Sequence, residues 1–553
     1  MVWHAHMLNP RAFLEDCIRY GKMSFWATEF PLAIINDCIH DCTLAYDPRE
    51  AAQERFITTA RRSWDNRDDP DTKAVICPRC KSKKDVPWTA RSITSLRSSD
   101  AFRTCHGFAD KNFNVTCSGC RLRITHEALK VAKFREDLRC LLDYDRPMPG
   151  TFYNARGMPE GVEPKKRNVV SLSFLFPNQL LKVVGEKVFK TTSFRKGPGD
   201  MSQVRDELQA FLFTRKTYRQ LPNRSTTSPL RFDEKVAFRR MMSRYWDNVS
   251  QFSMDLVGAV IRQGTFIEKM DRIDWLHSPT VMGTMERLIE KYRIFFEIVT
   301  MATDQRKMAV PTLDVDLAWH THQLSPFRYY EYSTFQTSQD NRSAPTFIDH
   351  DDKVDETRLS DGFEWTSAMY TDLTHGQIYS QCSCWYCEAT GASQASSSTA
   401  NLHNTRLFIS EDPDCNAHIS AHNAVATISP SSSTSSSSGL PTTTRQMKTL
   451  QLRSTYEREC RRTGKQINKD DTDTTMISWG IPFHMGPYYA PYVSDPSIHS
   501  DAYASNPTCM NLIPGGYGNC AAGTCGGAVA AGGCGSYAAG CASGGAAGGC
   551  GGC

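Results

Sequence analysis

The sequence lacks three features that would assign it to a protein class at once. It has no apolar run of about eighteen residues, the length a membrane-crossing helix needs, so we expect no membrane span. Its N-terminus shows no basic stretch followed by an apolar one, so no signal peptide is visible. Its net charge is only +4, from 64 Lys and Arg against 60 Asp and Glu, which does not by itself indicate binding to nucleic acid or membranes.

Cysteine, by contrast, is abundant, with 21 residues among 553. Because no signal peptide is visible, we expect a cytoplasmic or nuclear protein whose thiols stay reduced. Clustered cysteines in such a compartment indicate metal sites or redox chemistry more than structural disulfides.

The most informative feature is a motif that occurs twice. Residues 3–10 read Trp-His-Ala-His-Met-Leu-Asn-Pro, and residues 319–326 read Trp-His-Thr-His-Gln-Leu-Ser-Pro. The aligned Trp and His residues are Trp3, His4 and His6 in the first copy and Trp319, His320 and His322 in the second. Phe13 also aligns with Tyr329, and Glu15 with Glu331. Since Trp and His are scarce, the match predicts an internal repeat.

Each copy of the motif predicts a helix corner. Pro10 and Pro326 suit the first position of a helix, and the preceding Asn9 and Ser325 suit the capping position. One helix therefore ends in the motif and another begins after it. The second copy has residues 311–318 ahead of it and the first has only two residues, so we expect that the chain begins late.

Apolar spacing and turn residues predict a mainly α fold with small β elements. Two helical stripes, which we interpret as core packing, comprise Phe238, Met241, Met242, Tyr245, Val249, Phe252 and Leu256, and then Met285, Leu288, Ile289, Tyr292, Phe295, Phe296 and Val299. Residues 47–50 (Asp-Pro-Arg-Glu) predict a capping box that opens a helix through Phe56. Residues 168–176 predict a strand.

The same patterns divide the chain into five parts. We expect a first helical repeat over residues 1–163, with a zinc-ribbon-like insert at about 74–124. A connecting α/β segment (164–262) and a second helical repeat with a Cys cluster (263–395) follow. A low-complexity Ser/Thr-rich linker (396–445) leads to a basic, aromatic and Gly/Cys-rich tail (446–553). The end of that tail has almost no large apolar side chain to offset its ordering entropy, so we expect disorder.

Two CxxC pairs predict a structural zinc site. Its four ligands would be Cys77, Cys80, Cys117 and Cys120, each pair directing two sulfurs at one tetrahedral ion. The gap between the pairs is longer than in common zinc ribbons. Two unrelated Cys turns, a redox motif, or Cys105-His106 as a replacement ligand are the alternatives. A closed four-Cys site would serve folding and not catalysis.

A second group of cysteines allows several interpretations. Cys382, Cys384 and Cys387 would supply three metal ligands, with His375, Cys38 or Cys42 as candidates for the fourth, or they are plain thiols. The Gly-spaced tail cysteines allow metal binding, cross-linking or lipidation, or simply belong to a disordered tail.

The His motif has a structural and a functional interpretation. In the structural one it clamps the corner: Trp319 and Leu324 pack while the His rings hydrogen-bond across the turn. In the functional one Asp316, His320 and His322 form a metal or small-molecule site, which with Fe(II) would be a two-His-one-carboxylate set. Asp316 and His320 are four residues apart and face each other on a helix, whereas His320 and His322 diverge by about 200°.

Residues 310–326 with Tyr329 and Tyr330, the N-terminal copy and the Gly-rich C-terminus resemble the glycine-rich domain-containing protein-like family of plants and fungi. The Cys pairs, the Cys382 cluster and the tail look like a fungal member. The resemblance implies roles in development and stress responses, some linked to RNA binding. For some fungal members it implies a 2-oxoglutarate-dependent dioxygenase label. No RNP1-type aromatic pattern is present in this chain.

We therefore carry three hypotheses and favour a protein that is not an enzyme. The first is an intracellular scaffold or regulatory protein with structural zinc, whose Gly/Cys-rich tail binds protein partners. The second is a metal-dependent oxygenase of the non-haem Fe(II), 2-oxoglutarate type that uses Asp316, His320 and His322. The third is an RNA-associated stress-response protein.

Overall fold

The computed structural model describes residues 1–379 except for several short segments. These are 41–44, 66–67, 89–105, 111, 155, 161, 164–167, 170–175, 196, 213, 222–230, 247, 274–280, 306, 340–343 and 351–355. The predicted Cys382, Cys384 and Cys387 cluster, the linker and the tail lie outside the described residues, as do Cys42 and Cys105.

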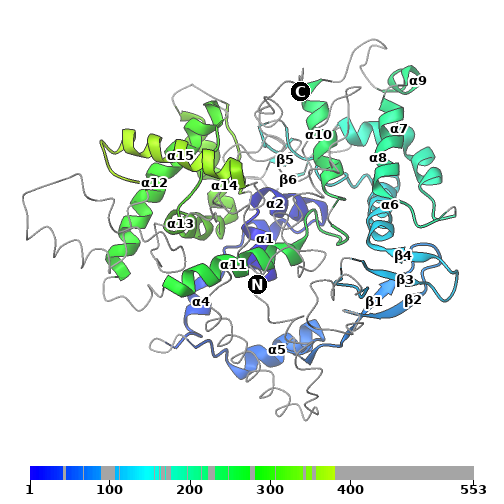
Figure 1. Cartoon of the computed structure of the whole chain (residues 1–553), viewed down its shortest axis with the longest axis horizontal. Coiled ribbons are helices and arrows are strands. Elements are labelled where there is room, and N and C mark those ends of the chain that lie inside the picture. The colour runs from blue at the N-terminus through cyan, green and yellow to red at the C-terminus, as the bar shows by residue number, and fades with distance from the viewer. Residues whose placement is uncertain are drawn as a thin grey trace, which may run out of the picture.

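The described chain is mainly helical, as the sequence predicts (Figure 1). The helices are α1 (Val2–Met7), α2 (Pro10–Arg19), α3 (Met23–Trp26), α4 (Leu32–Asn36), α5 (Glu50–Ala60), α6 (His126–Tyr144), α7 (Phe176–Thr191), α8 (Met201–Leu212), α9 (Arg215–Tyr218), α10 (Phe232–Ser243), α11 (Leu256–Ile273), α12 (Val281–Gln305), α13 (Leu313–Gln323), α14 (Pro326–Thr337) and α15 (Glu356–Leu373). The strands are β1 (Thr72–Ile76), β2 (Lys83–Pro87), β3 (Asn114–Thr116), β4 (Arg123–Thr125), β5 (Val162–Glu163) and β6 (Asn168–Val169), paired consecutively as antiparallel hairpins. Among the described helices, none has the length and hydropathy of a membrane-spanning helix.

Two hydrophobic cores organise these elements. One core joins α1–α3 to α12–α15 and includes the fully buried side chains of Trp26, Trp319 and Phe347. The other joins β1–β4 to α6–α8 and α10 through residues such as Phe134 and Phe238. In Figure 1 the two groups lie on opposite sides of α1 and α2. The first motif copy therefore sits at the junction of the two halves.

Both motif copies form the predicted helix corner. Helix α1 ends at Met7 and α2 begins at Pro10, and α13 ends at Gln323 and α14 begins at Pro326. The capping prediction is wrong in its detail, because neither Asn9 nor Ser325 caps the new helix with its side chain. Asn9 instead donates from its amide to the carbonyl of Ala5, 3.0 Å away, and so ties the corner to the preceding helix.

Three local predictions are corrected by the structure. Helix α5 begins at Glu50 without a side-chain cap, because the amide of Asp47 donates to the carbonyl of Cys38 at 2.8 Å. A strand was predicted over residues 168–176. Among the described residues of that range, only Asn168–Val169 form a strand, and Phe176 begins α7. The apolar stripe from Phe238 to Leu256 does not form one helix, because α10 ends at Ser243.

The end of α10 has a physical cause in the residues that follow it. The side chain of Asn248 accepts from the amide of Ser250 at 2.9 Å and donates to the carbonyl of Phe252 at 2.8 Å. Such local side-chain bonds compete with helical backbone bonds. Helix α12 agrees with its prediction, except that Ile289 is 60% exposed instead of packed.

A buried ion pair joins the two cores. Arg19 at the end of α2 donates to Asp137 of α6 at 2.5 Å, and both side chains are almost fully buried. The hydroxyl of Tyr245 donates to the second oxygen of Asp137 at 3.0 Å. These contacts fix α2 against α6.

We expect Arg19→Ala to destabilise the protein by about 3 kcal/mol, because it removes the closest cation from the buried Asp137 carboxylate and leaves only Arg146, at 3.9 Å. The matched control is Arg328→Ala. Arg328 lies 2.8 Å from Glu29, but its side chain is 74% exposed, so its removal should be nearly neutral. Urea unfolding of both variants measures the difference. Equal effects of the two substitutions would show that the buried pair has no special role.

Candidate metal centres

Each CxxC pair lies in the loop of a two-stranded hairpin, the first between β1 and β2 and the second between β3 and β4. In the first loop the amide of Cys77 donates to Ser82 at 2.9 Å, and the carbonyl of Cys77 accepts from Lys81 at 3.0 Å. The second loop repeats both bonds at the same lengths around Cys117. Lys81 and Arg121 also share a left-handed backbone, with φ of 63° and 61°. The two loops are therefore equivalent in conformation.

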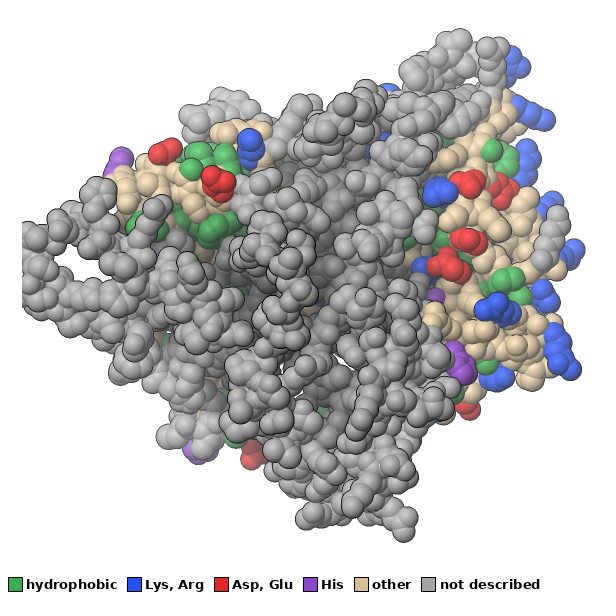
Figure 2. Space-filling model, in the orientation of Figure 1, with side chains coloured by type: hydrophobic (Ala, Val, Ile, Leu, Met, Phe, Trp, Pro, Cys, Tyr) green, Lys and Arg blue, Asp and Glu red, His purple; other side chains and the backbone are tan. Residues whose placement is uncertain are grey.

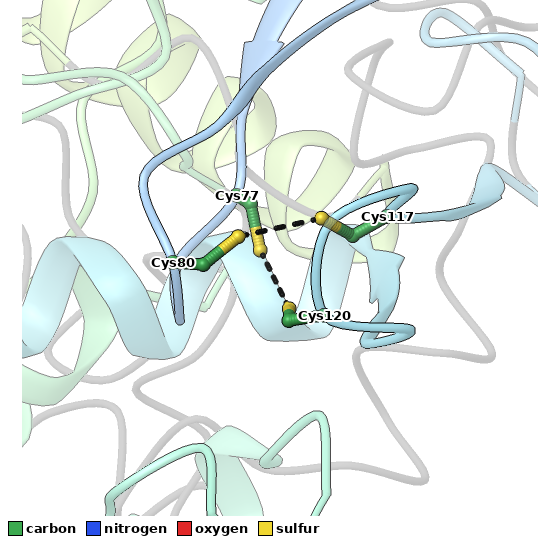
Figure 3. Close-up of side chains that lie close together, drawn as sticks. All are labelled: Cys77, Cys80, Cys117 and Cys120. Atoms are coloured by element: carbon green, nitrogen blue, oxygen red, sulfur yellow. Dashed lines mark hydrogen bonds between the residues drawn. The ribbon is translucent and has the colours of Figure 1, made fainter.

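The two loops bring four thiols together (Figure 3). We call Cys77, Cys80, Cys117 and Cys120 the four-cysteine cluster. The Sγ atoms of Cys77 and Cys120 are 3.6 Å apart, those of Cys80 and Cys117 are 3.5 Å apart, and all four lie within 4.8 Å of one another. Tetrahedral zinc with Zn–S bonds of about 2.3 Å requires sulfur separations of about 3.8 Å. The spacing and the donor set therefore fit a closed zinc site.

The surroundings of the thiols favour bound cations. The Ser82 hydroxyl lies 3.1 Å from the sulfurs of both Cys80 and Cys117, and it lowers the pKa of Cys80 and lowers that of Cys117 to about 6. Burial acts in the opposite direction at Cys77 and raises the pKa of its thiol to about 12. A bound divalent cation would deprotonate this thiol as well, because a coordinated sulfur is a thiolate.

A second group of possible ligands forms at the second motif copy. We call Asp316, His320 and His350 the Asp–His cluster. Asp316 and His320 face each other on α13, with Oδ1 and Nε2 3.3 Å apart, as the spacing predicts. His350 comes from the segment after α14, and its Nε2 lies 3.4 Å from both of those atoms. All three residues are buried.

His322 does not join this cluster, contrary to the metal-binding interpretation of the motif. It points to the other side of α13, where the hydroxyl of Tyr292 lies 2.9 Å from its Nδ1. Its ring also contacts Tyr329 and Tyr332 edge-on. His350 takes the third place instead. Nothing in its sequence surroundings indicates a ligand, because it lies thirty residues beyond His320 without a recognisable spacing.

The corner-clamp interpretation is correct for some side chains and wrong for others. Trp319 and Leu324 are buried, and the Trp319 indole donates across the corner to the Tyr329 hydroxyl at 2.9 Å. In the second copy the two His rings have other partners, His320 facing Asp316 and His350, and His322 facing Tyr292. In the first copy one His ring bonds across the turn, because His6 lies 3.0 Å from Asp16.

The remaining motif residues of the first copy make ring contacts. Trp3 packs against Phe25 and Phe30, and His4 contacts Phe30. Of the residues considered for the Cys382 cluster, Cys38 is half-buried and His375 is exposed.

Comparison with known proteins gives a match over part of the chain. Residues 202–331 match the family described as glycine-rich domain-containing protein-like, which confirms the resemblance for that segment. The chain is similar to glycine-rich domain-containing protein 1 of Arabidopsis thaliana, with 30% identity over 131 residues. The match covers 23% of this chain and 14% of that relative's own length. The fungal origin stays a prediction. No solved structure matches the chain.

The buried His322 predicts a specific pH dependence. Burial lowers the pKa of His322 from 6.5 to about 4, so the unfolded chain takes up a proton between these pH values and the folded chain does not. This contribution to stability is complete above pH 6.5 and falls by about 3 kcal/mol as the pH decreases to about 4. His322→Gln removes the titrating ring and keeps an acceptor for Tyr292. Urea unfolding at several pH values should show a shallower loss in this variant. The same pH dependence in both proteins would contradict the prediction.

Proposed function

Because residues 202–331 match the glycine-rich domain-containing protein-like family, we propose that the chain is a scaffold or regulatory protein related to that family. In this proposal the protein is intracellular, cytoplasmic or nuclear, and it is not an enzyme. Zinc stabilises its folded part, and the Gly/Cys-rich tail after residue 446 binds protein partners.

The observation that carries the zinc part of the proposal is the geometry of the four-cysteine cluster. Two-stranded hairpins are only marginally stable by themselves. Both hairpins also belong to the second core, which contains Val75, Val86 and Ile124 together with residues of α6. Zinc would tie the hairpins to each other and so hold one end of this core together. A site with four protein ligands has no open position, which supports a role in folding.

The two other hypotheses have less support. The oxygenase hypothesis based on Asp316, His320 and His322 needs three converging ligands, but the His322 ring contacts Tyr292 on α12. Fe(II) bound to that set is therefore not part of the proposal. For RNA binding, Figure 2 shows Lys and Arg side chains along the edge formed by β1–β4, α7 and α8, and Asp and Glu side chains on the same face, inward of that edge. Such mixed charge gives weaker attraction to phosphates than a continuous basic patch would.

We expect Cys77→Ser to remove one equivalent of zinc and to lower the melting temperature. Elemental analysis and circular dichroism measure these two effects. Cys17→Ser is the matched control, because Cys17 is equally buried but lies in the other core, outside the cluster. It should keep the full zinc content. A full zinc content in the Cys77→Ser protein would refute the structural zinc site.

We expect deletion of residues 396–553 to leave the helical content and melting transition of the remainder unchanged and to abolish capture of protein partners. Circular dichroism tests the first outcome. Quantitative pull-down with full-length and truncated protein tests the second. An unchanged set of partners after the deletion would reject the tail as the binding region.

A further inference from the structure

We propose that Asp316, His320 and His350 form a second metal site that binds one Zn²⁺ ion, with a fourth position for which the described residues supply no further His, Cys, Asp or Glu ligand. The site is separate from the four-cysteine cluster, because it belongs to the other core. It does not depend on the proposed scaffold role.

The distances within the Asp–His cluster are those of a metal site. The three atoms form a nearly equilateral triangle with sides of 3.3, 3.4 and 3.4 Å. Hydrogen bonds between nitrogen and oxygen are normally shorter, at about 2.9–3.0 Å. A tetrahedral ion with bonds of about 2.0–2.1 Å to nitrogen and oxygen requires edges of about 3.3–3.4 Å. The triangle thus matches one face of a zinc tetrahedron.

The donor set favours zinc over hard ions such as Mg²⁺ and Ca²⁺. Imidazole nitrogen suits zinc, whereas the hard ions take oxygen ligands. Two imidazoles and one carboxylate are also a ligand set that occurs at catalytic zinc sites, where a water or a substrate atom occupies the fourth position. In this chain that position would accept water or a small oxygen ligand such as a carboxylate.

Aromatic side chains line the cluster. The ring of Phe266 on α11 lies 4.7 Å from that of His320, and the ring of Trp319 lies 5.1 Å from that of His350. Such surroundings keep water away from the ligands and strengthen their attraction to a cation. The apolar packing also restricts the orientations of both imidazoles.

The first motif copy holds the segment that carries His350. Arg11 on α2 donates from its side chain to the carbonyl of Phe347 at 2.8 Å, and its amide lies 3.3 Å from Oδ1 of Asp349. Gly157 leaves room for this guanidinium, because a Cβ there would lie 1.7 Å from Nη2 of Arg11. Phe347 is fully buried. Helix α13, which carries part of the second copy, therefore provides two ligands, and helix α2, which follows the first copy, positions the third.

Elemental analysis of the full-length protein tests the site. We expect two equivalents of zinc in the wild type and one in Asp316→Asn and in His350→Gln. His322→Gln is the matched control, because His322 lies on the same helix outside the triangle, and it should retain both equivalents. Cys77→Ser should lose only the equivalent of the four-cysteine cluster, so failure of either site is seen separately.

A further variant separates loss of a ligand from loss of the fold. His350→Cys replaces one zinc ligand by another and should restore the second equivalent. Cobalt added to the metal-free Cys77→Ser protein should give a tetrahedral visible spectrum that the Cys77→Ser/His350→Gln double variant lacks. The Asp–His site is refuted if the wild type holds a single equivalent of zinc and only Cys77→Ser loses it. It is equally refuted if Asp316→Asn and His350→Gln keep the metal content of His322→Gln.

Discussion

Helix α2 is buried along its whole length although it carries Arg11, Glu15, Asp16 and Arg19. Removing such charges from water is costly, so each must be held by a partner in the fold. Arg11 donates to the carbonyl of Phe347, and Arg19 donates to Asp137 on α6. Glu15 accepts from the amide of Gly150 at 2.6 Å, and Asp16 accepts from the amide of Ser253 at 3.0 Å. Four separate parts of the chain are therefore placed by one helix.

The charged residues of α2 and their partners also interact with one another, so they form one network between the two cores. Burial raises the pKa of the Glu15 carboxyl, and Arg244 beside it opposes that shift. Arg244 also accepts a hydrogen bond at its carbonyl from Lys133 of α6, 2.9 Å away. A change at any of these charges leaves others buried without a partner, which is far more costly than the loss of a single bond. The Asp–His cluster is thus linked to α2 through Arg11 and the segment with Phe347, and the core that contains the four-cysteine hairpins is linked to it through Arg19 and α6.

The sequence predicted features with a local physical cause. Pro10 and Pro326 mark the two corners because proline is suited to the first turn of a helix, and the CxxC pairs mark the hairpin loops that form the four-cysteine cluster. His350 and the partners of α2 were not predictable, because they depend on contacts between distant segments. The end of α10 at Ser243 was missed for another reason: the apolar spacing continues while the turn formed around Asn248 interrupts the backbone.

The two motif copies form the same type of backbone corner, but their side chains make different contacts. In the first copy the bond across the corner runs from His6 to Asp16, and in the second it runs from Trp319 to the Tyr329 hydroxyl. The first histidine of the second copy, His320, faces Asp316 four residues earlier on the same helix. In the first copy the carboxylate that His6 bonds, Asp16, also accepts from the Ser253 hydroxyl, and the first histidine, His4, lies beside the ring of Phe30. One copy has thus become the structural centre of the fold, and the other presents the converging side chains.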